Sequence, residues 1–486
     1  MEKSKSLSLR DILIFWIPLA ATWLMMAFEG PFIAAVIARM VDPKFNLAAY
    51  GIAFSFALII EAPIIMLMSA SIALVGDSTA FFKLRRYTHL LNLIITLLMI
   101  ALLTPPAFDF IAFRVLDLPA DLAHLTHIAT ILLLPWPSAI GYRRFYQGIL
   151  IRNKLTHLVG KGTFIRLCSM TLSALGAWHF LPSVSGAWVG SFALSAGVLM
   201  EAASIRYMAR HVVRRLREPQ SGAAPPTGPG MSYLQITQFY YPLALSSILG
   251  LSAQPMITFF VGQSRFPIES LAVLPVISSV SFIFKSLGLS YQEVGVALLG
   301  DSLTGYRKIR TFAIRLGLTL VAALSLLAFT PLSRFWFSTV SGLSNELMQF
   351  SLVPLMIVTI LPGLEVMISF QRSVLVNSKK TFPITIATAI EVAVIMLTLS
   401  GMIHWFDSTG AVAACTALLI GRIAAIGFLA FPFRSVMMGF RRLAAQSIIE
   451  PGSSIDFQDR CHRQQRPQNT NRSIPVSCMP LGDDPD

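Results

Sequence analysis

Charge is scarce in this chain of 486 residues. Only 13% of the residues are charged and 55% are hydrophobic, whereas about a quarter of the residues of a soluble globular domain are charged. The mean hydropathy of +0.68 points the same way. This composition excludes an ordinary soluble protein and predicts a polytopic membrane protein, surrounded by membrane lipids.

Cysteine is also rare. Two of the four cysteines lie in apolar runs and two in the polar C-terminal region: Cys168, Cys415, Cys461 and Cys478. Their spacing gives neither a disulfide framework nor a zinc site. His124 and His127 lie near each other but have no third ligand in the sequence around them, so we predict no metal site.

Catalytic signatures are missing as well. The sequence has no phosphate-binding glycine loop with its lysine, no His-Glu-x-x-His and no nucleophile elbow. We therefore expect neither an enzyme nor an ATP-driven pump, and no cofactor. Function is expected to reside in the ionisable residues of the apolar segments.

What the chain does have is an internal repeat. The segment from Arg10 to Met208 reappears between Leu234 and Phe433, shifted by 224 or 225 positions. The matches run through both copies and include Pro18-Leu19-Ala20 with Pro242-Leu243-Ala244, Gly76-Asp77-Ser78 with Gly300-Asp301-Ser302, Tyr146-Gln147 with Phe370-Gln371, and Gly186-Ala187 with Gly410-Ala411. Self-similarity at a fixed offset indicates a duplicated structural unit.

Each copy contains six apolar runs of the length that crosses a membrane, about 20 residues. They lie near 12–38, 47–75, 88–108, 122–142, 158–181 and 185–207, and then near 234–261, 270–299, 312–333, 348–371, 382–405 and 410–432. Six is an even number, so both copies enter the membrane in the same direction. The sequence predicts an all-α membrane protein with twelve transmembrane helices in two six-helix lobes related by a parallel repeat.

Basic residues predict the orientation of these spans. The loops on one side are rich in Lys and Arg, including Arg143 and Arg144 in the loop expected after the fourth span, whereas the other side has only Arg39, Lys44, Arg114, Arg265 and Arg334. The basic side is cytoplasmic by the positive-inside rule. We expect a multi-pass protein of the plasma or inner membrane with both termini in the cytoplasm. The net charge of +14 follows from this topology, so no nucleic-acid partner is expected.

The repeat also predicts the domain organisation. We expect an N-terminal lobe over 1–209, a cytosolic linker rich in Pro and Gly over 210–231, a C-terminal lobe over 232–433 and a disordered cytosolic tail over 434–486. We expect no cleavable leader, because the first apolar run is too long and belongs to the repeat.

Two pairs of repeat mates carry opposite charges in the middle of predicted spans. Glu61 corresponds to Lys285, and Arg166 corresponds to Glu391. Charges at this depth are costly unless they are paired or hydrated, and they often mark transport pathways. We predict that Glu61 and Lys285 face a central cavity as substrate contacts or as an interlobe gate. The alternative buries each inside its own lobe, and for Arg166 and Glu391 we favour this structural ion-pair role.

Prolines near a polar residue mark a second pair of positions. Glu29 precedes Pro31 in the first span, and Gln254 precedes Pro255 in the seventh. We expect both helices to be broken there, since matched discontinuities point to a transporter's binding site. Glu29 is a candidate for binding a proton or a sodium ion, although it could instead reach the outer surface.

Three further polar residues are weaker candidates. Glu365, beside Pro362 and Gly363, is a second candidate for ion coupling. Gln292 and Glu293 are candidates for lining the substrate cavity.

The repeat and several short motifs resemble a known superfamily. Two six-helix lobes that each open with Pro-Leu-Ala resemble the superfamily of multidrug and toxic compound extrusion (MATE) transporters and lipid-linked oligosaccharide flippases. Within it, the chain is most similar to the progressive ankylosis protein family. The similar stretches are Leu47-Ala48-Ala49-Tyr50-Gly51-Ile52-Ala53-Phe54-Ser55, Gly148-Ile149-Leu150-Ile151-Arg152-Asn153-Lys154, Tyr241-Pro242-Leu243-Ala244-Leu245 and Lys379-Lys380-Thr381-Phe382.

The resemblance implies an exporter that alternates between inward-open and outward-open states and moves a small anion of the citrate, nucleotide or pyrophosphate class. Lys285 suits such a substrate. Three alternatives stay open: cation-coupled extrusion of cationic amphipathic compounds, which would use Glu29 and Glu61, a lipid-linked precursor flippase, and a scaffold without transport activity. The partners expected in either transporter case are a small-molecule substrate and a coupling proton or sodium ion.

Overall fold

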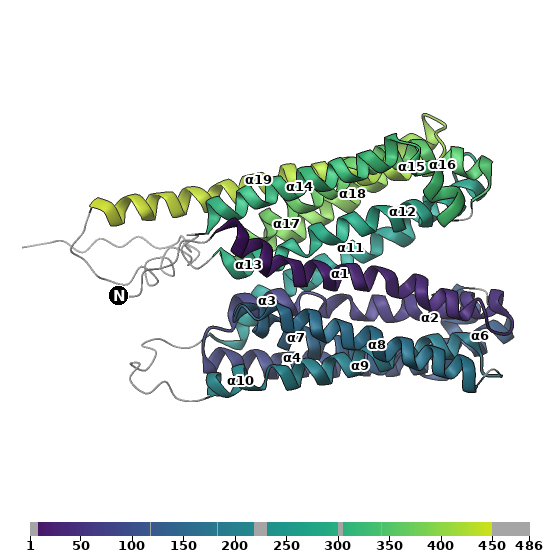
Figure 1. Ribbon diagram of the computed structural model, residues 1–486, viewed down its shortest axis with the longest axis horizontal. Helices are drawn as coiled ribbons and strands as arrows, with labels where there is room; N and C mark the ends of the chain where they lie inside the picture. Colours follow the sequence, from purple (N-terminus) through teal and green to yellow (C-terminus); the bar gives the residue numbers. More distant parts are fainter. Residues whose placement is uncertain are drawn as a thin grey trace, which may run out of the picture. The chain divides into compact units, whose positions relative to one another are not determined.

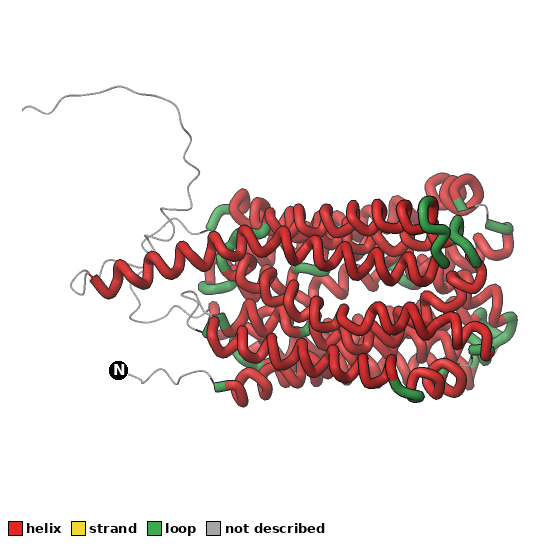
Figure 2. The backbone as a smooth tube through the Cα atoms, turned by 90° about the horizontal axis from the view of Figure 1, so that it is seen from above, coloured by secondary structure: helices red, strands yellow, loops and turns green. Residues whose placement is uncertain are grey.

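The protein is built of helices. The computed structural model describes residues 8–449 with the exception of 117, 182, 218–230, 300–304 and 342. Figure 2 shows helices joined by short loops, and the described residues include no β-strand. An isolated bridge between Arg265 and Thr409 is the one extended pairing recorded among them.

The first half of the chain forms one group of helices (Figure 1). Its elements are α1 (Leu9–Ile37), α2 (Pro43–Glu61), η1 (Ala62–Ile64), α3 (Leu67–Leu74), α4 (Ser78–Leu103), α5 (Pro105–Asp109), η2 (Phe110–Val115), α6 (Ala120–Leu132), α7 (Pro135–Arg152), α8 (Thr156–Phe180), α9 (Gly186–Met208) and α10 (Arg210–Arg217).

The second half repeats this order beside the first (Figure 1). Its elements are α11 (Tyr233–Val261), α12 (Pro267–Leu289), α13 (Tyr291–Leu298), α14 (Tyr306–Phe329), α15 (Leu332–Phe335), η3 (Trp336–Val340), α16 (Asn345–Ile357), η4 (Val358–Ile360), α17 (Leu361–Asn377), α18 (Phe382–His404) and α19 (Gly410–Ile449).

Ten helices of the described chain are long and apolar enough to cross a membrane. The two other predicted spans, near 122–142 and 158–181, coincide with α6 and α7 and with α8. These helices fall outside the ten because α6 has only 13 residues, while α7 and α8 are less apolar and carry Arg143, Arg144 and Arg166. The protein is a multi-pass integral membrane protein with an all-helical fold.

The same local structures occur at equivalent positions of the two halves. Ser8 and Ser232 each close a capping box at the start of α1 and α11. Asp42 and Phe266 precede α2 and α12 with left-handed backbones, at φ of 49° and 54°. Lys154 and Lys379 follow α7 and α17 in the same left-handed region, at 60° and 57°.

At these two lysines the left-handed residue ends the helix in a Schellman motif. Leu155 N–H donates to the carbonyl of Leu150, and Lys380 N–H donates to that of Leu375, each over 2.9 Å. A bulky residue adopts this conformation at a cost, so its presence at both positions reflects a backbone requirement that the two halves share.

The predicted helix breaks at Pro31 and Pro255 are wrong. Both prolines lie inside continuous helices, α1 and α11. A proline removes only its own N–H donor, and packing against neighbouring helices can keep the helix intact on both sides. The paired prolines therefore do not open the backbone as a binding site.

The edges of the predicted domains carry more helix than expected. Residues 210–217 of the predicted linker form α10, with Val212 and Val213 buried. At the other boundary, α19 continues past residue 433 to Ile449. Residues 218–230 of the predicted linker, the tail beyond 449 and the second copy of the Gly-Asp-Ser motif lie outside the described residues.

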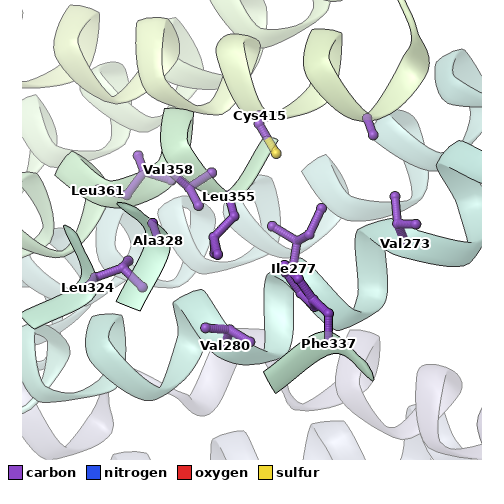
Figure 3. Packing of buried hydrophobic residues seen from close by; sticks show 11 residues of the cluster. Val273, Ile277, Val280, Leu324, Ala328, Phe337, Leu355, Val358, Leu361 and Cys415 are labelled. Carbon is purple, nitrogen blue, oxygen red and sulfur yellow. The ribbon is translucent and has the colours of Figure 1, made fainter. Parts of the chain in front are cut away.

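The described residues up to Val436 form one compact unit, and those from Met437 form another. Within the first unit, a large apolar core of the second half gathers side chains from α12, α14, η3, α16, η4, α17 and α19 (Figure 3). Ile277, Phe337 and Leu355 are at most 1% exposed in it. Such cores keep the helices of the second half together while leaving their polar residues to meet elsewhere.

Gly148 provides a test of packing in the first half. A Cβ atom at this position of α7 would lie 2.5 Å from Ser71 Cβ and 2.6 Å from the backbone oxygen of Met68 in α3. We expect Gly148→Ala to lower the free energy of unfolding by about 1–3 kcal/mol, because overpacking outweighs the gain in helix propensity. Thermal unfolding in detergent measures it.

The matched control is Gly176→Ala in α8, where no atom lies within 4 Å of the added Cβ. We expect this variant to unfold at the wild-type temperature or above it. Equal stability of the two variants would contradict the close approach of α7 and α3.

Candidate functional site

A buried carboxylate, that of Glu201 on α9, is the centre of a polar cluster in the first half. Arg143 donates to it over 2.5 Å and Gln147 over 3.1 Å, both from α7. From α8, Thr163 donates over 3.0 Å and Arg166 lies 3.6 Å away. Glu201 is 0% exposed, so its charge is compensated by side chains alone. We call Glu29, Glu61, Arg143, Arg144, Arg166 and Glu201 the first-half cluster.

Glu29 belongs to this cluster. Its side chain is 5% exposed and forms an ion pair with Arg166. Burial excludes the alternative in which Glu29 reaches the outer surface. One carboxylate oxygen, Oε1, has no hydrogen-bond partner among the described residues. Glu29 therefore links α1 to α8 and still has an oxygen that could accept a proton or a cation.

Glu61, at the end of α2, is also buried, at 5% exposed. The charges that act on it are those of Arg144, Arg143 and Arg166, in that order. It forms no ion pair within the described chain. Glu61 thus shares the positive charges of this cluster.

The second half has a cluster of the opposite arrangement, centred on Arg422 of α19. Its guanidinium lies 3.1 Å from Glu391 of α18 and 3.3 Å from Glu365 of α17. Arg372 of α17 donates to Thr388 over 3.2 Å and lies near the same charges. Lys285 of α12 is half-buried, and Glu365, Arg422 and Glu391 act on its ammonium group. We call these five charged residues the second-half cluster.

The two clusters mirror each other with the charges reversed. In the first half a carboxylate on α9 holds two arginines, whereas in the second half an arginine on α19 holds two carboxylates. The repeat mates Arg166 and Glu391 both pair with these central ions. A reversal at the centre is thus matched by a reversal at the partner, so each central ion lies beside partners of opposite charge.

The structure does not bring Glu61 and Lys285 together. Each lies with the charges of its own half, and no ion pair joins the two residues in the described chain. Gln254 is exposed on α11 and lies in neither cluster. Among the described residues no group of three metal-binding side chains could hold a metal ion.

Hydrogen bonds join the two halves at the end where α1 and α11 begin. Trp16 donates to Ser290 over 2.8 Å, and Tyr240 donates to the carbonyl of Pro63 over 2.5 Å. Gln292 of α13 donates to Ser69 of α3 over 3.2 Å. The short helices α3 and α13 pack against each other there (Figure 1). We call this contact region the joint.

A small pocket lies at the joint, with a volume of about 10 Å³, room for about one water molecule. Its polar lining comes from Arg143, Arg144 and Gln147 of α7 and from Glu293 of α13. The rest of the lining comes from α1, with Leu19, Thr22, Trp23 and Met26, from α3 with Met68 and from α8 with Val159. Both predicted cavity residues of α13, Gln292 and Glu293, thus lie at the joint, and the first-half cluster borders the pocket.

Sequence reasoning missed the role of α7. Arg143 and Arg144 were expected in a cytoplasmic loop, but they are 3% and 8% exposed inside a helix that ends at Arg152. The sequence did carry a signal that the helix continues through Arg143 and Arg144. No glycine, proline or turn residue interrupts Tyr142–Gln147, and the next turn begins at Asn153. Glu201 and Arg422 were missed because their partners lie on other helices.

Comparison with known proteins shows which solved structures share this fold. Protein-family models give no match, and neither do curated proteins. Solved structures do match. A mutant of the Vibrio cholerae MATE transporter VcmN shares 16% identity at a TM-score of 0.68, covering 89% of this chain and 97% of that one.

Two other structures are similar to a comparable degree. An outward-facing multidrug resistance MATE family transporter of the MOP superfamily shares 15% identity at a TM-score of 0.69, covering 91% of this chain and 99% of that one. A MOP superfamily transporter from Pyrococcus furiosus shares 14% identity at a TM-score of 0.67, covering 91% and 100%. The chain therefore shares the fold of these MATE structures over about nine-tenths of its length.

The Glu201 centre gives a stability test. We expect Glu201→Ala to lower the free energy of unfolding by about 3–5 kcal/mol, because buried Arg143 loses the one ion pair that it forms among the described residues. Thermal unfolding in detergent measures the loss.

Asp407→Ala is the control. Its ion pair with Arg265 is 3.5 Å long, and the side chains of Asp407 and Arg265 are 78% and 56% exposed. Removal of this pair should therefore lower the free energy of unfolding by less than about 1 kcal/mol. If Glu201→Ala is no less stable than Asp407→Ala, the cluster does not hold the first half together.

Proposed function

We propose that the protein is a secondary active transporter with twelve transmembrane helices, arranged as two six-helix lobes related by a parallel repeat. The matched caps, left-handed residues and Schellman motifs of the two halves support the repeat. The MATE-like fold over about nine-tenths of the chain supports the transporter. The distribution of basic loops supports a cytoplasmic location for both termini and the joint.

The proposed substrate is a small organic or phosphate anion of the citrate, nucleotide or pyrophosphate class, exported by alternating access. The observation that carries this proposal is the surplus of positive charge in the second-half cluster. Three cations, Lys285, Arg372 and Arg422, lie with only two carboxylates, Glu365 and Glu391. Such a surplus inside a membrane is costly unless an anion or water shares the site.

The resemblance to the progressive ankylosis family supports the same class of substrate. Lys285 and Arg372 both lack an ion pair in the described chain, but Arg372 has a hydrogen-bond partner in Thr388, so we propose Lys285 as the substrate contact. Arg422 is already held by two carboxylates, and Arg372 donates to Thr388.

Cation-coupled extrusion of cationic compounds is the second candidate. One observation favours it: Glu29 has an unpartnered, buried oxygen on α1. The fold is compatible with either charge of substrate, since the Pyrococcus furiosus relative is described as having a binding pocket of reverse polarity that suggests a different function. Here Glu29 is already paired with Arg166, which leaves less attraction for a cationic substrate.

The substrate proposal is tested in proteoliposomes loaded with labelled citrate, pyrophosphate or a cationic dye. We expect Lys285→Ala to reduce anion efflux about tenfold or more, because a partly buried charged contact is lost, and Lys285→Arg to retain most of it. Lys308→Ala removes an exposed lysine of α14 and serves as the control.

Anion efflux that Lys285→Ala leaves intact would remove Lys285 from the site. Dye efflux without anion efflux would establish the second candidate instead. Loss of thermal stability in Lys285→Ala, without recovery of transport in Lys285→Arg, would assign the lysine a structural role.

Glu29 is tested through ion coupling. We expect Glu29→Gln to abolish the dependence of efflux on a proton or sodium gradient, because the amide keeps the shape but cannot change its charge. Efflux is measured with and without imposed gradients. Coupling that is unchanged in Glu29→Gln would exclude this residue as the carrier of the ion.

A further inference from the structure

Arg144 and Glu293 line the same small pocket from opposite sides of the joint, and neither forms an ion pair in the described chain, although Arg144 belongs to the first-half cluster, where its charge acts on Glu61. Arg144 comes from the first half and Glu293 from the second, and they are 8% and 6% exposed. Both line the small pocket. Neither repeat mate is charged, since Ile368 corresponds to Arg144 and Ser69 to Glu293. The duplicated fold therefore does not require these charges.

Both side chains have unused hydrogen-bonding groups. Arg144 Nε and Glu293 Oε2 have no partner among the described residues. The preceding residue, Arg143, differs from Arg144 because it donates a hydrogen bond to Glu201 over 2.5 Å. Arg144 is the cation whose charge acts on Glu293, but the two form no ion pair within 4 Å in the described chain. A buried guanidinium in this position is a ready site for a carboxylate or a phosphate group.

We propose that Arg144 is an entry site for the anionic group of the substrate on the side of the joint, and that Glu293 covers this site when the joint is closed. The proposal rests on the proposed anion transport. Glu293 supplies the carboxylate that balances Arg144 in the closed state. A pocket of about 10 Å³ holds about one water molecule, so the substrate and the closed joint exclude each other.

The position of the two residues gives the sequence of events. Arg144 belongs to α7 and Glu293 to α13, so opening of the joint separates them. Arg144 then faces the entering anion without its counter-charge. Closure brings Glu293 back, and two negative groups at one guanidinium repel each other. The joint therefore closes only after the anion has left Arg144.

Accessibility of the pocket tests the inference directly. Met68 lines the pocket and is 5% exposed, so a Met68→Cys variant, with the native cysteines replaced, reports opening through its rate of reaction with a membrane-impermeant maleimide. Citrate and pyrophosphate are the soluble probes, in liposomes of phosphatidylcholine with or without phosphatidylglycerol.

We expect citrate or pyrophosphate to increase the labelling rate in the protein with intact Arg144 and Glu293. In Glu293→Gln the labelling rate without anion should rise about fivefold, and the half-saturating anion concentration should fall by a similar factor, because the closed state loses its charge pairing. Glu293→Asp should restore the original behaviour in part. Arg144→Gln should remove the response to anions, and Arg144→Lys should keep part of it.

The outcomes separate this inference from the function on which it rests. If anions are transported but Arg144→Gln and Glu293→Gln label and respond as the parent does, the entry site is refuted while the function stands. If Glu293→Gln raises labelling but neither anion is transported or changes the rate, the proposed function fails and the charge pair only stabilises the joint. A response to phosphatidylglycerol alone would assign Arg144 to a lipid headgroup and overturn the proposal.

Discussion

The compensation of buried charge is the constraint on which the rest of this structure depends. Glu201 is completely buried and meets Arg143, Gln147, Thr163 and Arg166 from two other helices. Through Arg166 the network reaches Glu29 and so includes α1. An ion at this depth without partners would cost several kcal/mol, so α1, α7, α8 and α9 are held in one arrangement. The apolar faces of these helices alone would not specify it, since lipid is as apolar as their side chains.

Reversal of polarity between the halves shows that compensation, and not the sign of a particular residue, is what the fold requires. Arg422 takes the central position in the second half, and Glu365 and Glu391 surround it. The backbone features at the ends of the helices are the same in both halves, but the charges inside are exchanged. One scaffold can thus present a balanced cluster on one side and a positive surplus on the other.

The sequence was a good guide to the helices and a poor one to their partners. Apolar runs predicted the positions of α1 and α18 to within several residues. The predicted start of α4 was less accurate: the helix begins at Ser78 and not at 88, because its first turns are polar. The sequence favoured a structural ion-pair role for Arg166 and Glu391 inside their own halves, but it did not indicate their partners, Glu29 and Arg422, which lie 137 and 31 positions away. Pairings of this kind depend on how helices pack, which periodicity does not encode.

Arg143 and Arg144 illustrate the same limit. In a sequence, two arginines at the end of an apolar run indicate a cytoplasmic loop, because isolated charges are costly in a membrane. A buried carboxylate removes that cost for Arg143, and α7 continues for two more turns. Arg144 forms no ion pair in the described chain, and its charge acts on Glu61 of its own half and on Glu293 of the other half. Separation of the halves removes the contribution of Glu293. The electrostatic surroundings of Arg144 therefore differ between conformations, and this makes the joint, more than either cluster, the region that changes.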